Sequence, residues 1–503
     1  MQRKQLTLVI VSLLVVVLSV SLAWFTTQII GKGKDVSVTS ANLQIVFTDS
    51  DGSISGSNIE PGWSATKTFT VQNNSKSEYK YNIVIKDLLN TFVTNGYLKY
   101  KITSTNDGYN MTEFKDIPKS SVATDTILAY SVVIPNGVTQ SYTIEFKYAN
   151  DESVDQSEDM GKKLSGTLFI TEGTEDPNKT LYNQLLVDKS TKLTRTDFST
   201  VLTTDNTNTL YTSTEDSKTV YYFAGNATDN WVKFGKNESN QDLYWRIIRT
   251  NSDGSVRLLY HGTSTTATDA VINTSTKFNE TRNDPMYVGY MYGTSGSLVN
   301  NRTNINNSTI KTTIDNWYTS NLEAKGYTKY LSTTAVYCND RSNPASGYNT
   351  GNTSFNYGAG TRLDTNETPT YDCTDTNDKF TVDTSTGNGK LTYPIALMTA
   401  DEVSFAGGVY RTKAETWYYY NSAKGSSTGS TWWWLLSSYR WNGSYAYVFG
   451  VGGSSIPGRL DDRDVNYTNG VRPAISLKSC TLYSTGNGSA SDPYTIKETS
   501  SGC

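Results

Sequence analysis

Short runs in which apolar and polar residues alternate fill the first third of the chain. Residues 68–72 and 142–148 alternate throughout, and similar runs occur at 42–47, 80–85, 98–102, 129–134 and 166–170. Alternation with a period of two buries one face of a β-strand. Turn-forming residues, such as Pro61-Gly62 and Pro135-Asn136-Gly137, separate the runs. The pattern predicts an antiparallel β-sandwich over residues 35–173.

The N-terminus carries an uncharged run of twenty residues, 6–25, which Arg3 and Lys4 precede. A helix of that length spans a hydrocarbon core of about 30 Å. Basic residues before an apolar run are typical of an export signal. We therefore expect residues 1–30 to be a signal peptide, cut near Ser21 or Ala23, or an uncut single-pass anchor. A buried core helix is the alternative. Either export route places the rest of the chain outside the cell or at its surface.

Length and charge limit the classes of partner. A chain of 503 residues is long enough for two or three domains. Its net charge is −4 and it has no basic cluster, which argues against nucleic acid as a partner.

Four cysteines lie in the C-terminal half of the chain. An even number in an exported region predicts two disulfides, most simply Cys338–Cys373 and Cys480–Cys503, although three connectivities are possible. A zinc site is the rival interpretation. The chain has no CxxC spacing and its one histidine is His261, so we expect no metal.

A polar stretch follows the predicted sandwich. Residues 174–217 are rich in Thr, Asp and Asn, with too few apolar residues for a core, and we interpret them as a linker. The apolar spacing at 181–187 predicts a short helix within it.

Residues 218–503 are predicted to form an α+β domain, so that the chain as a whole is mainly β. Runs at 243–249 and 256–260 flank a turn at 251–254 and predict a hairpin. Near-helical apolar spacing between Ser308 and Gly326 predicts one helix. Thr399 and Glu402 have the spacing of a capping box and predict the start of another.

Residues 432–469 have an unusual composition. They contain four Trp, four Tyr, five Ser, five Gly, three Asn and three Arg, with no Lys or Glu. Binding surfaces favour this mixture, since aromatic rings give large contact areas and Ser, Gly and Asn give adaptable hydrogen bonds. Ordinary packing is the alternative, and some of Trp432, Trp433 and Trp434 must be core because adjacent strand residues point to opposite faces. The predicted ligand contacts are Tyr439, Arg440, Trp441, Asn442, Tyr445 and Tyr447.

The N-terminal part resembles the TasA/camelysin family. The residues that carry the resemblance are Ala23-Trp24-Phe25-Thr26, Ser40-Ala41-Asn42-Leu43, and Ile59-Glu60-Pro61-Gly62 leading into 67–74. The resemblance implies an exported surface protein of Gram-positive bacteria, a small sandwich that can self-associate into matrix fibres, and release of the segment before Trp24. No HExxH motif is present to support a metallopeptidase.

The C-terminal part resembles a C-type-lectin-like domain of the formylglycine-generating-enzyme type. Residues 432–438, 446–451 and Gly470-Val471-Arg472-Pro473-Ala474 carry this resemblance. It implies a scaffold that bacterial proteins diversified by retroelements use to display variable side chains. Residues 218–503 also resemble uncharacterised exported proteins of gut Firmicutes, through 244–249, 287–293, 338–341, 393–406 and 470–477.

The chain departs from these families at the sites of their chemistry. The cysteine pair that binds copper in formylglycine-generating enzymes has no close counterpart, and Trp441-Asn442-Gly443 stands where calcium-dependent lectins have WND. The run Asp461-Asp462-Arg463-Asp464 is interpreted as a solvated turn and not as a calcium site. We predict no cofactor.

Catalytic arrangements find little support. His261 follows the predicted strand 256–260 and is interpreted as a surface imidazole. Asp401 and Glu402 are interpreted as helix-cap residues. The chain is therefore predicted not to be an enzyme but an adhesin-like surface protein that presents aromatic and Arg side chains to an extracellular glycan or protein. A biofilm-matrix or fibre subunit, which self-associates through the sandwich, and an exported hydrolase are the alternatives.

Overall fold

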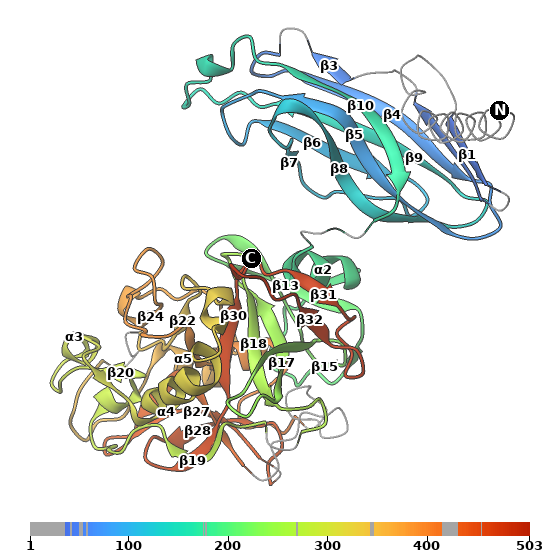
Figure 1. The fold of residues 1–503 in the computed structure, drawn as a ribbon. Helices are drawn as coiled ribbons and strands as arrows, with labels where there is room; N and C mark the ends of the chain where they lie inside the picture. The colour runs from blue at the N-terminus through green and yellow to red at the C-terminus, as the bar shows by residue number, and fades with distance from the viewer. Residues whose placement is uncertain are drawn as a thin grey trace, which may run out of the picture. The chain divides into compact units, whose positions relative to one another are not determined.

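The computed structural model describes residues 59–503, except 175, 177–178, 268–269, 343–346, 415–430 and 454, together with the backbone of three strands before residue 59 (Figure 1). The chain divides into two compact units, Met1–Pro177 and Asn178–Cys503. The predicted export segment, residues 1–30, lies outside the described residues. Among the helices that are described, none combines the length and the apolar character needed to cross a bilayer.

The first unit consists of two antiparallel sheets. The first sheet has the order β1 (Val36–Ser40), β2 (Leu43–Asp49), β4 (Ser64–Asn73), β9 (Thr139–Tyr148), β6 (Leu98–Ser104) and β7 (Lys115–Asp116). The second has the order β3 (Ile54–Gly56), β10 (Leu164–Glu172), β5 (Tyr79–Asn90) and β8 (Ser120–Ile134). Every strand predicted between residues 42 and 170 is present.

One hydrophobic core fills the space between these two sheets. Along β9 every second residue is buried, and Ile144 and Phe146 are at most 2% exposed. They belong to the same cluster as Ile83 and Ile85 on β5. Polar atoms in the core are satisfied across the sheets, since the Tyr81 hydroxyl donates to Gln140 Oε1 at 2.7 Å. The predicted antiparallel sandwich is thus present.

The second unit contains two larger sheets. The ten-stranded sheet has the order β11 (Thr191–Thr194), β13 (Thr209–Glu215), β14 (Lys218–Tyr222), β17 (Asp242–Thr250), β16 (Trp231–Lys236), β32 (Tyr494–Ile496) and β31 (Tyr483–Thr485); β18 (Val256–Gly262), β30 (Pro473–Leu477) and β25 (Ile395–Leu397) extend it from β17. The six-stranded sheet has the order β19 (Asn273–Lys277), β29 (Thr468–Val471), β26 (Trp433–Trp441), β27 (Ala446–Val451) and β28 (Leu460–Asp464), with β23 (Phe355–Asn356) paired to β26.

Three two-stranded ladders and several short helices complete this unit. The ladders pair β12 (Asp205–Asn206) with β15 (Asn226–Ala227), β20 (Met291–Tyr292) with β21 (Asn306–Asn307), and β22 (Tyr337–Cys338) with β24 (Lys379–Phe380). The α-helices are α2 (Leu181–Asp188), α3 (Leu298–Asn301), α4 (Thr309–Tyr318), α5 (Gly358–Gly360) and α6 (Ala400–Phe405). Short 3-10 turns occur at Ser157–Asp159 in the first unit and at Pro285–Val288, Tyr327–Tyr330 and Thr376–Asp378 in the second, and π-helical turns at Thr319–Glu323 and Thr361–Asn366.

The predicted linker, 174–217, requires correction, because residues 179–217 are part of the second unit. The predicted short helix is α2, whose Leu181 and Leu185 are buried in the core of the unit. Leu210 on β13 is also fully buried. Threonine suits a strand, so the polar composition concealed one strand pair of the large sheet rather than marking a linker.

Local signals placed the other elements of the second unit correctly. The predicted hairpin is β17–β18, with Gly254 at φ 78° in its turn. The Ser308 side chain caps α4 by accepting from the Lys311 amide. Thr399 and Glu402 form the predicted capping box at the start of α6. Both predicted disulfides, Cys338–Cys373 and Cys480–Cys503, are present.

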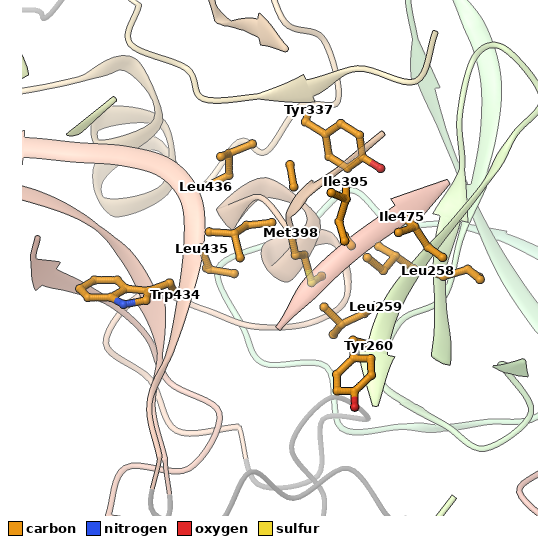
Figure 2. Close-up of a cluster of buried hydrophobic side chains, with 14 of the residues drawn as sticks. Leu258, Leu259, Tyr260, Tyr337, Ile395, Met398, Trp434, Leu435, Leu436 and Ile475 are labelled. Carbon is orange, nitrogen blue, oxygen red and sulfur yellow. The ribbon is translucent and has the colours of Figure 1, made fainter. Parts of the chain in front are cut away.

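The core of the second unit continues from one large sheet to the other. Figure 2 shows Leu435 and Leu436 of β26 beside Met398, with Leu258, Leu259 and Ile475 of the ten-stranded sheet beyond. Two hydrogen bonds hold β26 to the start of α6 and the segment before it. The Leu436 amide donates to the Met398 carbonyl at 2.9 Å, and the Ala400 amide donates to Ser437 Oγ at 3.0 Å.

A buried ion cluster fixes α6 against the ten-stranded sheet. Glu402 Oε1 accepts from Arg249 Nε at 2.9 Å and from Arg257 Nη1 at 2.8 Å, and all three side chains are at most 3% exposed. Arg249 also pairs with Glu215 at 2.8 Å. Burial acts to raise the pKa of Glu402, but Arg257 and Arg249 outweigh it and hold the pKa below its usual value.

We expect Glu402→Gln to lower the free energy of unfolding of this unit by about 3–5 kcal/mol at pH 7, because it leaves two buried guanidinium groups without their shared anion. Because the pKa of Glu402 is lowered in the folded state, its contribution is complete above the unfolded value of about 4.3 and is lost as the pH falls through the folded value. Urea unfolding from pH 7 to pH 3 measures this. Glu280→Gln, in an exposed pair with Lys277, is the matched control and should cost below about 1 kcal/mol. An equal cost for the two variants would contradict the expectation.

Candidate functional site

The aromatic segment 432–469 forms three adjacent strands of the six-stranded sheet. β26 pairs with β27, with Arg440 opposite Tyr447, and β27 pairs with β28, with Tyr447 opposite Asp464. β28 is an edge strand of this sheet. The run Asp461-Asp462-Arg463-Asp464, interpreted from sequence as a turn, is therefore part of a strand, and its side chains point alternately to the two sides.

Two of the six predicted contact residues lie in the core. Tyr439 and Trp441 are each 2% exposed. Trp441 Nε1 donates to the Gly351 carbonyl at 2.8 Å, and the Tyr439 hydroxyl donates to Asp364 Oδ2 at 2.8 Å. Two residues apart on one strand, they share the inward face. The prediction that they contact a ligand is corrected: both are packing residues that support the strand.

The other four predicted residues lie together at the surface. Tyr445 is exposed, and Arg440, Asn442 and Tyr447 are partly exposed. The Arg440 guanidinium lies 4.9 Å from the centre of the Tyr447 ring and donates to Asp462 at 3.2 Å. Asn442 Nδ2 donates to the Tyr447 hydroxyl at 3.2 Å. The Tyr445 amide donates to Asn442 Oδ1 at 2.7 Å.

Two further arginines join this surface from distant parts of the sequence. Arg282 lies 3.8 Å from the centre of the Tyr445 ring, and Arg411 lies 5.0 Å from that of Tyr410. Arg282 pairs with Asp464, and Arg411 lies 3.5 Å from Asp462. We call Arg282, Arg411, Arg440, Tyr410, Tyr445 and Tyr447 the arginine–tyrosine surface. No sequence signal marked Arg282, Tyr410 or Arg411, because they lie outside the aromatic segment.

Stacking and ion pairing together hold these guanidinium groups in place. Arg282 pairs with Asp464 and Arg440 with Asp462, while Arg411 lies 3.5 Å from Asp462 and 3.7 Å from Asp461. Each guanidinium of the surface therefore has a carboxylate beside it. Burial raises the pKa of Tyr447, with Asp464 adding to the effect. Its phenol is therefore protonated at neutral pH and is available as a hydrogen-bond donor. The surface thus offers ring faces and fixed N–H and O–H donors.

Acidic side chains also line a small enclosed cavity elsewhere in the second unit. Its volume is about 20 Å³, enough for one water, and Asp340 and Asp401 contribute to its wall. Both carboxylates are paired with Arg362, whose Nη2 lies 2.5 Å and 2.7 Å from them. This arrangement is a closed ion-pair network and leaves no room for a substrate.

The remaining candidate groups have structural positions. His261 is fully buried, with its ring edge-on to Trp231 at 4.4 Å, so the predicted surface imidazole is corrected. The reason is that all seven residues of β18 are buried, including the end of the strand. Across the part of the chain that the structure describes, no three His, Cys, Asp or Glu side chains are grouped so as to hold a metal ion.

Comparison with known proteins gives no family for the chain. No protein-family model and no curated protein matches it. Among solved structures, a ruminal GH26 endo-beta-1,4-mannanase is similar at 16% identity and a TM-score of 0.15, over 29% of this chain and 29% of that chain. The chain thus spans less than a third of that enzyme, and a similarity at this TM-score carries no argument about fold or activity.

Burial separates packing residues from surface residues in a measurable way. We expect Trp441→Ala to lower the free energy of unfolding by about 3–5 kcal/mol, because it removes a fully packed indole and leaves a cavity. Tyr445→Ala should cost below about 1 kcal/mol, since it removes one exposed ring and its contact with Arg282. Denaturant titration of both variants tests this. Similar losses for the two would show that the assigned burial is wrong.

Proposed function

We propose that the second unit is the ligand-binding domain of an exported bacterial surface protein, and that the arginine–tyrosine surface contacts an extracellular glycan or protein. The observation that carries the proposal is the continuous series of contacts from Arg282 through Tyr445, Asn442 and Tyr447 to Arg440. Tyr and Arg are residue types that commonly dominate binding energy.

The geometry favours binding because the side chains are held before a ligand arrives. Arg440 is held by a ring and a carboxylate at once, so less of its rotamer freedom remains to be lost on binding. Tyr445 and Tyr447 offer amphipathic rings, whose faces stack on apolar ring surfaces while their hydroxyls form hydrogen bonds. Sugars and protein side chains both match this combination.

Export is part of the proposal. The two disulfides support an oxidising compartment, since such bonds are rare in the bacterial cytosol. The sandwich of the first unit then serves as a spacer or anchor, in keeping with its resemblance to exported matrix proteins. The lectin-like resemblance of the second unit agrees with a domain whose aromatic strands carry a binding surface.

We expect Arg440→Ala to weaken ligand binding by roughly 30-fold, the effect of losing a residue worth about 2 kcal/mol at the centre of a binding surface. The full exported chain is applied to an array of neutral and acidic oligosaccharides and of immobilised surface proteins, and the best binder is titrated by calorimetry. Lys325→Gln, which removes an exposed cation that donates to Asn240, is the matched control and should bind as the parent does.

Thermal unfolding of the same variants distinguishes the possible outcomes. Arg440→Ala should keep the melting temperature within a few degrees of the parent, because its side chain is partly exposed. Loss of binding with the fold intact supports the proposal. Unchanged binding by a variant that lacks both Arg440 and Tyr447 would reject the arginine–tyrosine surface as the contact region.

A further inference from the structure

Arg463 on β28 differs from the three arginines of the arginine–tyrosine surface. Its guanidinium lies 3.5 Å from the centre of the Trp432 ring and 5.9 Å from that of Tyr467. Within the part of the chain that the structure describes, it has neither a hydrogen-bond acceptor nor an ion-pair partner, and its Nε is buried without an acceptor. Arg463 and Trp432 are both partly exposed, so a ligand can reach them.

We call this pair of side chains the Trp432–Arg463 stack, and the backbone of β27 leaves room for it at Gly450. Arg463 is paired with Val448 on β27, and Val448 lies two residues before Gly450 on that strand. A Cβ at position 450 would lie 3.3 Å from Arg463 Cγ and 3.9 Å from Trp432 Cε3. Glycine therefore allows the arginine stem and the indole to lie across the strand, and it fixes where the guanidinium sits.

The charge of Arg463 lacks a dedicated counter-ion. Burial lowers the pKa of Arg463, and Asp461 opposes this only in part. Asp461 is itself engaged, because Arg459 pairs with it and Arg411 Nε lies 3.7 Å away. Asp462 and Asp464, on the other side of β28, pair with the arginine–tyrosine surface. A guanidinium is charged throughout the physiological pH range, so Arg463 presents an uncompensated, partly desolvated cation.

We propose that the Trp432–Arg463 stack is a binding site for an oxyanion, carried as the carboxylate of an acidic sugar or as a sulfate ester on the ligand. This inference deepens the proposed function by naming a charged class of ligand. The identity of the ligand rests on the proposed function, whereas the presence of an anion-binding site at Arg463 does not. A planar guanidinium matches the two oxygens of a carboxylate or sulfate. The indole lies against the guanidinium and orients its plane; because Nε is buried, the two terminal nitrogens are the donors that a ligand would meet.

The test compares an acidic oligosaccharide with its neutral ester and with a sulfated oligosaccharide. Oligogalacturonate, its fully methyl-esterified form and a galactan oligosaccharide bearing 6-sulfate are titrated into the full chain by calorimetry. We expect the acid form to bind roughly 10- to 100-fold more tightly than the ester, the range of a charge-assisted hydrogen-bond pair. Arg463→Gln should abolish this preference, and Arg463→Lys should keep part of it, because the charge remains and the fork is lost. The sulfated arm shows which oxyanion is preferred.

Two controls keep the outcomes separate. Arg440→Gln should weaken acid and ester alike, since it alters the arginine–tyrosine surface. Inorganic sulfate, compared with chloride at equal ionic strength, stabilises folded chains in general; it should raise the melting temperature of the parent and of Lys325→Gln by more than that of Arg463→Gln. Equal binding of acid and ester by the parent, or a preference that survives Arg463→Gln, overturns the oxyanion site and leaves the proposed function standing. If sulfate gives an extra rise in melting temperature in the chains that keep Arg463, and no saccharide binds, the oxyanion site is supported and a glycan is rejected as the ligand.

Discussion

Glu402 is the group on which the arrangement of the second unit most depends. It closes the capping box of α6 and binds Arg249 and Arg257, which lie on the two strands of the β17–β18 hairpin. An isolated buried carboxylate is costly, and this one is stabilised only while all its partners stay in register. The segment that leads into α6 in turn holds β26 through the contacts of Leu436 and Ser437. The position of β26 therefore depends on this buried salt-bridge cluster.

β26 runs from the core to the surface of the second unit. From Trp433 to Tyr439 it is buried on both sides, and Asn339, fully buried, accepts the Ser438 amide and donates to the Leu436 carbonyl. Only at Arg440 does a side chain leave the core, while Trp441 on the next position returns to it. Arg440 thus lies on a strand whose neighbouring residues cannot move without opening the core.

Local patterns in the sequence predicted the elements well and the site only in part. Alternation at 142–148, the cap at Ser308 and the capping box at Thr399 each act within a few residues, so their outcomes were predictable. The inward orientation of Tyr439 and Trp441 depends on partners at Asp364 and Gly351, and the contributions of Arg282 and Arg411 depend on how distant loops pack. Such choices are made by tertiary contacts, which no short pattern records. The Thr-rich region 179–217 was misinterpreted for a similar reason, since its few leucines find their core only in the folded unit.

The alternation of charge along β28 gives the two sides of one edge strand different chemistry. Asp462 and Asp464 point to the side of Tyr447 and compensate the arginines there, so that surface suits a ligand that stacks and forms hydrogen bonds without a strong charge of its own. Arg463 points to the side of Gly450 and Trp432, where Asp461 is shared with two other arginines. A strand places successive side chains on opposite faces, so three consecutive residues, acid, base and acid, are sufficient to create both environments. A polymer long enough to pass over the edge would meet a neutral ring surface and a cation in turn, and an oligosaccharide with occasional acidic units has that pattern.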